Sequence, residues 1–280
     1  PSRSTIMTGT WPHTNGVIKN NVPLDPLTPT IATLLAEEYR TALFGKWHLG
    51  NEVIRQHGFD EWVSNDDYYR RYYTDPKYLS VLSDYHRFLI DRGLEPDDES
   101  EGAMVFSREF SASLPEELTK ATFVSSRVAD FIRRNSERPF ALYVNFLEPH
   151  PPYDGPFNDM YDPSLLPVSP TFLKDPPENA GLLALLRSKA SLLGADMDEK
   201  PSGPYDEAYW RALIARYWGN VTLVDRAVGR ILHALDEAGI ADRTIVVFTS
   251  EHGDQLGEHN IIGKAVVYEQ SIRVPMLMRV

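Results

Sequence analysis

Histidine stands just after each of three apolar segments, and after two of them other residues that can hold or move charge lie beside it. The residues that follow the three segments are Lys46 and His48, then His150, and then Glu251, His252 and Asp254. Imidazole titrates near neutral pH and can give or take a proton, while lysine is a fixed cation. A single histidine of this kind is more often structural, but three in equivalent places favour one shared site.

Two more cations could join that site, Arg3 near the start of the chain and Lys264 shortly after the third segment. They matter because the chain as a whole is acidic, with a formal net charge of -12. Nucleic acids and anionic membranes are recognised through clustered lysine and arginine, so the composition argues against both as partners. Any anion that the protein binds must be held by a local basic pocket.

The composition sets further limits. With 280 residues, 42% of them hydrophobic, the chain is long enough for one large α/β unit. Cysteine is absent, so neither disulfides nor thiolate metal ligands can form within these residues. No run approaches the ~20 apolar residues that a membrane helix needs, and no secretory signal is visible at the N-terminus.

The three apolar segments and a fourth one near the end are predicted to be buried strands. They comprise residues 41–45, 140–147, 244–249 and 274–278. Helical periodicity appears between them: Thr28 could cap a helix with Pro29 at its first position, and apolar stripes run through residues 121–132 and 206–238, the last one ending at Gly239. This alternation predicts an α/β fold with a mostly parallel central sheet and helices on both faces.

The predicted sheet would bring the histidine-bearing loops together. In an open α/β sheet, ligands bind beyond the carboxyl ends of the strands, where these loops lie. Residues 64–116 and 155–205 lack strong periodicity and are rich in Pro, Asp, Ser and Tyr. We expect them to be insertions or long loops on the scaffold.

Five motifs resemble those of the sulfatase family, within the alkaline-phosphatase-like superfamily, and they occur in the family's order from the first residue to the last. They read "PSRSTIMTG", "GKWHLG", "EPHPPY", "FTSEHGDQLGEH" and "GKAVVYEQSIRVPMLMR". The resemblance implies that residues 1–280 are a fragment of a sulfatase catalytic domain, truncated at both ends. The nucleophile, the strand with paired metal-binding aspartates and a C-terminal subdomain would then lie outside the chain, and the fragment alone is expected to be inactive.

The resemblance also implies roles. The family's nucleophile is a formylglycine, made by a formylglycine-generating enzyme, and it would stand two places before Pro1. Lys46 and Lys264 would contact the sulfate, and Arg3 would stabilise a negative oxygen near the nucleophile. His150 would protonate the leaving alcohol, and His48 would contact the hydrated aldehyde and help to release sulfate.

Glu251 and His252 occupy the family's metal-binding position, where the usual pair is Asp followed by Asn or His. Glutamate is one methylene longer than aspartate, so the metal or the backbone would have to shift. Calcium is the metal that the resemblance implies, although the nitrogen ligand of His252 would suit manganese or zinc somewhat better. Asp254 and His259 match less constrained places and are as readily structural.

Three functions remain open. The first is a metal-dependent sulfatase acting on a sulfated small molecule or glycan, in a periplasmic or secreted setting. The second is a phosphodiesterase or phosphonate monoester hydrolase of the same superfamily. The third is a non-catalytic protein that binds anions or glycans, which the unusual Glu251 would favour. The aromatic run in "DDYYRRYYTDPKY" could stack on sugar rings or simply pack on its own domain, and no role is assigned to it.

Overall fold

The computed structural model describes residues 1–192 and 206–280, which fall into two units. The first unit comprises Pro1–Pro149 and Leu223–Thr244, and the second comprises His150–Thr222 and Ile245–Val280. Helix α8 (Glu207–Glu237) is shared, because its first half belongs to the second unit and its second half to the first. The end of the predicted insertion 155–205 lies outside the described residues.

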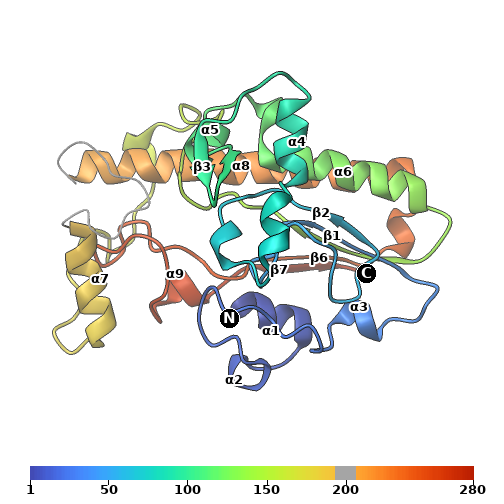
Figure 1. The fold of residues 1–280 in the computed structure, drawn as a ribbon. Coiled ribbons are helices and arrows are strands. Elements are labelled where there is room, and N and C mark those ends of the chain that lie inside the picture. The colour runs from blue at the N-terminus through green and yellow to red at the C-terminus, as the bar shows by residue number, and fades with distance from the viewer. Residues whose placement is uncertain (193–205) are drawn as a thin grey trace. The chain divides into compact units, whose positions relative to one another are not determined.

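A parallel sheet forms the centre of the first unit (Figure 1). Its order is β2-β1-β5, with β1 spanning Arg40–Gly45, β2 Glu61–Val63 and β5 Phe140–Asn145. The central strand β1 is buried from its second residue to its last, as expected for a strand with a neighbour on each side. The predicted strands at 41–45 and 140–147 and their parallel arrangement are thus confirmed.

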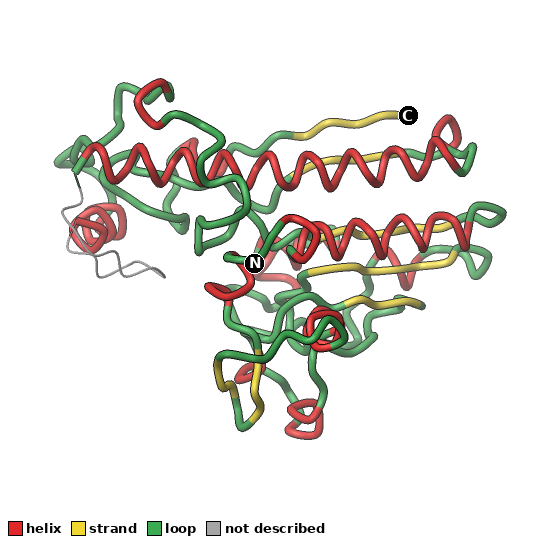
Figure 2. Tube along the Cα trace, turned by 90° about the horizontal axis from the view of Figure 1, so that it is seen from above, coloured by secondary structure: helices red, strands yellow, loops and turns green. Residues whose placement is uncertain are grey.

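Helices cover both faces of this sheet. Consecutive side chains of a strand point to opposite faces. Leu43 packs in a cluster with Met7 of α1 (Ser2–Thr8) and Ala32 of α3 (Ile31–Leu34). Phe44, on the other face, meets the ring of Phe131 from α6 (Lys120–Asn135) edge to face, with the ring centres 5.6 Å apart. Figure 2 shows α6 running along the strands.

The helix predicted to start after Thr28 begins later than expected. Thr30 is the N-cap of α3, because its backbone N–H donates to the side-chain oxygen of Thr33 at 3.0 Å, as in a capping box. This capping box selects Thr30 over Thr28 and leaves Pro29 outside the helix. The two longer predicted helices are confirmed as α6 and α8, and Gly239 follows α8 with a left-handed φ of 66°.

Residues 64–116 fold into a chain of short elements. These are the 3₁₀ turns η1 (Arg70–Tyr72) and η2 (Pro76–Ser80), α4 (Asp84–Ile90), the hairpin of β3 (Asp98–Ser100) with β4 (Ala103–Val105), and α5 (Arg108–Ala112). The guanidinium of Arg70 is fully buried and donates to the backbone carbonyls of Leu79, Val81 and Ser100. This one side chain therefore ties three separate turns of the segment together.

The remaining short elements of the first unit lie around this frame. They are α2 (Pro12–Asn15), η3 (Glu116–Leu118) and η5 (Ala241–Arg243). The carboxylate of Glu116 accepts hydrogen bonds from Arg226 and Arg230 of α8, at 2.9 and 2.5 Å. The second half of α8 is thereby fastened beside α6, which begins just after η3.

The second unit carries a two-stranded antiparallel ribbon of β6 (Val246–Thr249) and β7 (Met276–Arg279). Strands were predicted here, but residues 244–249 and 274–278 were wrongly expected to be buried: Phe248 of the first is 39% exposed and Leu277 of the second 66%. The reason is that β6 pairs only with β7 among the described residues, so the apolar side chains are left partly uncovered. Its helices are η4 (Pro163–Leu165), α7 (Leu182–Leu192) and α9 (Glu269–Ile272), and its core gathers around Tyr153, Trp210 and Leu213.

Helix α8 has 31 residues, which is long enough to cross a membrane, but length is only one of the two requirements for a membrane span. In the described part of the chain, none of the helices is both long enough and apolar enough to span a membrane.

Gly45, the last residue of β1, is expected to be intolerant of a side chain. Its φ is 103°, and a Cβ atom would lie 1.9 Å from the backbone oxygen of Asn145 on β5. Gly45→Ala should lower the free energy of unfolding by about 3 kcal/mol or more, since both strain and a backbone clash are introduced. Urea unfolding measures this loss.

Gly93→Ala is the matched control, because Gly93 also has a left-handed φ of 78° but has open space where the Cβ would stand. Its substitution should cost only about 1 kcal/mol. Equal losses at the two positions would contradict the close approach of β1 to β5.

Candidate functional site

The loop after β1 carries two of the predicted site residues and is anchored by the residue between them. Trp47 is fully buried, with its ring centre 5.3 Å from that of Trp62 and 6.4 Å from that of Phe59. The backbone N–H of Lys46 donates to the carbonyl of Asn145 at 2.9 Å. Lys46 and His48 are therefore held at the carboxyl end of the central strand.

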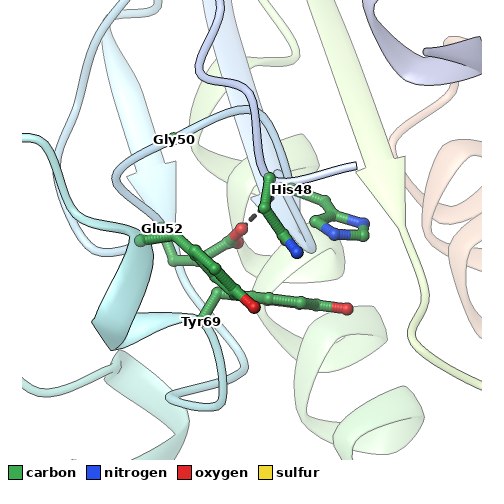
Figure 3. Close-up of a pocket in the computed structure, with 6 residues that line it drawn as sticks. His48, Gly50, Glu52 and Tyr69 are labelled. Atoms are coloured by element: carbon green, nitrogen blue, oxygen red, sulfur yellow. Dashed lines mark hydrogen bonds between the residues drawn. The ribbon is translucent and has the colours of Figure 1, made fainter. Parts of the chain in front are cut away.

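A buried carboxylate fixes the backbone of this loop. The two oxygens of Glu52 accept hydrogen bonds from the N–H groups of Trp47 and His48, at 2.9 and 2.5 Å. Figure 3 shows Glu52 beneath His48. Burial raises the pKa of Glu52 to about 7, although the two N–H donors and the positive charge of Lys46 act in the opposite direction. Burial therefore favours the protonated form of this acid much more than it would for an exposed glutamate.

His48 lies in a constrained position on that loop. Its φ of 59° is left-handed, an uncommon conformation for a residue with a side chain. Its imidazole stacks on the ring of Tyr69, with the ring centres 4.1 Å apart and the planes 23° from parallel. A cavity of about 10 Å³, room for roughly one water molecule, opens here and is lined by Asn21, His48, Gly50, Glu52, Tyr69 and Tyr72 (Figure 3).

Arg3 and Lys46 meet through the backbone. The guanidinium of Arg3, in the first turn of α1, donates from Nη1 to the carbonyl oxygen of Lys46 at 2.9 Å. The Lys46 side chain is 3% exposed, and its Nζ lies 5.8 Å from the centre of the Tyr69 ring. Of the predicted catalytic residues, Arg3, Lys46 and His48 are therefore gathered in the first unit.

An ion network lies behind Tyr69. The buried carboxylate of Asp66 accepts hydrogen bonds from Arg108 and Lys120 at 2.8 and 2.7 Å. Burial alone would raise the pKa of Asp66, but the charges of Arg108 and Lys120 outweigh it and hold the pKa well below its usual range. Asp66 stays ionised, and the network keeps one net positive charge near the loop.

The other predicted site residues belong to the second unit. His150 follows β5 after a short loop, and its Nδ1 lies 2.8 Å from the backbone oxygen of Pro151. Glu251 and His252 lie side by side after β6, with Oε1 of Glu251 3.3 Å from Nε2 of His252.

Glu251 and His252 were predicted to bind a metal, and among the described residues no third ligand is arranged with them. A carboxylate oxygen and an imidazole nitrogen are both common ligands of divalent metals. Over residues 1–192 and 206–280, however, no group of three or more His, Cys, Asp or Glu side chains is arranged to hold an ion. Calcium takes six to eight oxygen ligands, so two donors leave most of its coordination to be supplied otherwise.

Lys264 lies near Asp254, to which no firm role was assigned from the sequence. The carboxylate of Asp254 accepts hydrogen bonds from the hydroxyl of Tyr153 at 2.9 Å and from the N–H of Gly263 at 3.0 Å. Burial raises the pKa of Asp254, while the Tyr153 hydrogen bond and the charge of Lys264 oppose the rise. Asp254 therefore fixes the backbone one residue before Lys264, much as Glu52 fixes the loop of His48.

Sequence reasoning missed Glu52, Asp66 and the role of Tyr69. Glu52 stands four residues after His48, where a single glutamate carries no recognisable signal. Tyr69 lies within the aromatic run noted above, yet only the tertiary contact distinguishes it from the other tyrosines. The aromatic run was thus the one sequence signal that could have pointed to it.

Comparison with known proteins gives a consistent picture. The family model described as "Sulfatase" matches residues 1–280. The multifunctional alkaline phosphatase superfamily protein PehA of Trinickia caryophylli is 26% identical over 298 residues, covering 100% of this chain and 57% of PehA. An N-acetylglucosamine-6-O-sulfatase of Bacteroides thetaiotaomicron is 26% identical over 337 residues and is covered to 54%. The chain thus spans about half the length of these curated relatives.

A solved structure shares the fold. The phosphonate monoester hydrolase SpPMH from Silicibacter pomeroyi superimposes with a TM-score of 0.75 at 22% identity, covering 100% of this chain and 58% of that protein. At this level of identity the likeness supports the fold alone. It agrees with an alkaline-phosphatase-like α/β architecture of which the present chain is a part.

The raised pKa of Glu52 predicts a pH-dependent stability that depends on this one side chain. Protonation favours the folded state, because the pKa is about 7 in the fold and 4.5 in the unfolded chain. This stabilisation is complete below pH ~4.5 and is lost as the pH rises through ~7. Over that window the free energy of unfolding of the wild type should fall by about 3 kcal/mol relative to Glu52→Gln.

Urea unfolding of both proteins across this pH range measures the difference. Glu52→Gln should also be less stable at low pH, because its amide nitrogen cannot accept one of the two backbone hydrogen bonds. Glu37→Gln, at an exposed position, is the control and should keep the pH profile of the wild type. The same profile in Glu52→Gln would contradict the burial of a titrating acid beneath the loop.

Proposed function

Because the chain belongs to the sulfatase family, we propose that the protein hydrolyses sulfuric esters, using Arg3, Lys46, His48, His150 and Lys264. The observation that carries the proposal is the grouping of Arg3, Lys46 and His48 at the carboxyl end of β1, in a chain matched by the family model over its whole length. In a protein of net charge -12, such a local basic group is suited to an anionic substrate.

The proposed roles follow from the charge changes of the reaction. Nucleophilic attack on sulfur breaks the bond between sulfur and the bridging oxygen, and negative charge builds on that oxygen as the alcohol leaves. Lys46 and Lys264 would stabilise the sulfate oxygens as fixed cations. His150 would give a proton to the leaving alcohol, and His48 would hold and move a proton at the nucleophile. Arg3, which donates to the backbone of Lys46, would stabilise a negative oxygen near the nucleophile.

The nucleophile in this proposal is a formylglycine two places before Pro1, formed by a formylglycine-generating enzyme. When present, the hydrated aldehyde of this group would supply the oxygen that attacks sulfur. For the metal, we propose that Glu251 and His252 supply two ligands and that the ion is calcium, with manganese or another divalent metal as the alternative. The remaining ligands would come from elsewhere in the full-length protein.

A sulfated glycan is the substrate class we favour, and a second reaction has its own support. The relative from Bacteroides thetaiotaomicron is named for removing a 6-O-sulfate from N-acetylglucosamine. PehA, by contrast, is named a multifunctional member of the alkaline phosphatase superfamily. The second candidate is therefore hydrolysis of phosphodiesters or phosphonate monoesters, in which the same cations would face phosphorus.

The full-length protein should hydrolyse a generic aryl sulfate faster than an aryl phosphate diester. Release of the phenol with each substrate gives the two rates. A faster rate with the phosphate diester would move the assignment to the second candidate. No turnover of either substrate by metal-saturated protein would instead favour a non-catalytic protein that binds anions.

Lys264→Ala tests the proposed charge contact in the same assay, and kcat should fall by about 100-fold, the scale for losing one transition-state contact. Lys189→Ala is the matched control, an exposed lysine of the second unit that has no place in the proposed site. Unfolding curves of both variants should match that of the wild type. An unchanged kcat in Lys264→Ala would remove this lysine from the site.

Metal binding can be tested without reference to activity. Glu251→Ala should weaken calcium binding to the full-length protein by about tenfold or more, because a ligand is lost. Titration calorimetry with calcium, and then with manganese, measures the affinities. Glu178→Ala, at an exposed position of the second unit, should bind as the wild type does. Equal affinities in all three proteins would exclude Glu251 as a ligand.

A further inference from the structure

Tyr69 contacts two of the proposed catalytic residues with one ring. Its face is stacked on the imidazole of His48, with 4.1 Å between the ring centres, and Nζ of Lys46 lies 5.8 Å from the same ring centre. The tyrosine is 6% exposed and directly precedes the turn η1. It comes from the segment 64–116, which carries none of the family motifs quoted above.

The ring of Tyr69 is itself held in place. The guanidinium of Arg108 lies 5.2 Å from its centre and is fixed by the ion pair with Asp66, which also binds Lys120 of α6. In addition, the buried guanidinium of Arg70, the residue after Tyr69, ties η1 to three backbone carbonyls. Tyr69 therefore stands on a rigid support that leads back to the helix packed on the central sheet.

An aromatic face in this position attracts nearby cationic groups and also restricts the orientation of the imidazole stacked on it. The face of the ring carries the negative part of its quadrupole, which attracts an imidazolium or an ammonium group. Burial raises the pKa of the Tyr69 hydroxyl to about 12, so the ring stays uncharged throughout the physiological range. Stacking also restricts the rotation of the imidazole, which would otherwise have to be ordered when substrate binds.

We propose that Tyr69 is a positioning residue, which orients His48 and the ammonium group of Lys46 for the reaction. The proposal rests on the proposed function of these two residues, and it deepens that function by tying their geometry to the segment 64–116. It predicts that the aromatic ring is required, while the hydroxyl is not.

Two substitutions of Tyr69 distinguish the effect of its aromatic ring from the effect of its side-chain volume. Tyr69→Phe keeps the aromatic face and should retain kcat within about threefold. Tyr69→Leu fills a similar space without a quadrupole and should lower kcat by about tenfold or more, with little change in KM, because orientation of the reacting groups is lost. Tyr78→Leu, in the same segment, is the control and should behave as the wild type. Assays use the full-length protein with the better of the two aryl esters.

A spectroscopic measurement tests the stacking independently of turnover. The carbon-bound protons of the His48 imidazole lie over the face of Tyr69 and are shielded by its ring current. In proton NMR these signals should move downfield in Tyr69→Leu and stay in place in Tyr69→Phe and Tyr78→Leu.

The outcomes distinguish this inference from the function on which it rests. A wild type that hydrolyses neither ester would overturn the proposed function, whatever the NMR spectra show. An active wild type with unchanged kcat in Tyr69→Leu would overturn the role of Tyr69 alone. A drop in kcat of the same size in Tyr69→Phe would also overturn it, because the hydroxyl rather than the ring would then be the required group.

Discussion

The geometry of the candidate site depends on one buried carboxylate. Glu52 has two backbone N–H groups as hydrogen-bond partners, and these belong to Trp47 and His48. A carboxylate without such partners would be costly inside a protein, and two N–H groups without an acceptor would be equally unfavourable. The loop and the acid therefore stabilise each other, and the backbone path of the loop sets where Lys46 and His48 can reach.

The loop is held from two sides by different kinds of interaction. Toward the core, Trp47 is packed among aromatic rings, so apolar contact fixes the depth of the loop. Toward the segment 64–116, the contacts are a stacked tyrosine and an ion network with two cations and one carboxylate. The apolar side resists displacement of the whole loop, while the polar side sets the electrostatic surroundings of the histidine and the lysine. A segment that the sequence marks only as irregular thus contributes directly to the site.

Much of the fold could be predicted from the sequence, because β1 and β5 are apolar runs and α6 and α8 have clear helical periodicity. The strand β2 was missed because it has three half-buried residues and no distinct pattern. Residues 244–249 were expected to be buried because they are apolar, but composition does not show which strands will lie beside a given one. For the site, Lys46 and His48 could be found from a local motif, whereas Glu52 and Tyr69 depend on contacts that only the folded chain makes. The meeting of all five proposed catalytic residues stays a prediction, because they are divided between the two units.

The left-handed backbone of His48 has a practical consequence for mutagenesis. At a φ of 59°, an alanine would remove the imidazole and also place a residue with little tolerance for this conformation. Any loss of activity would then combine a missing ring with a loop that has relaxed to another path. Asparagine adopts this backbone region far more readily and lacks an imidazole, so it is the cleaner replacement for isolating what the ring itself contributes.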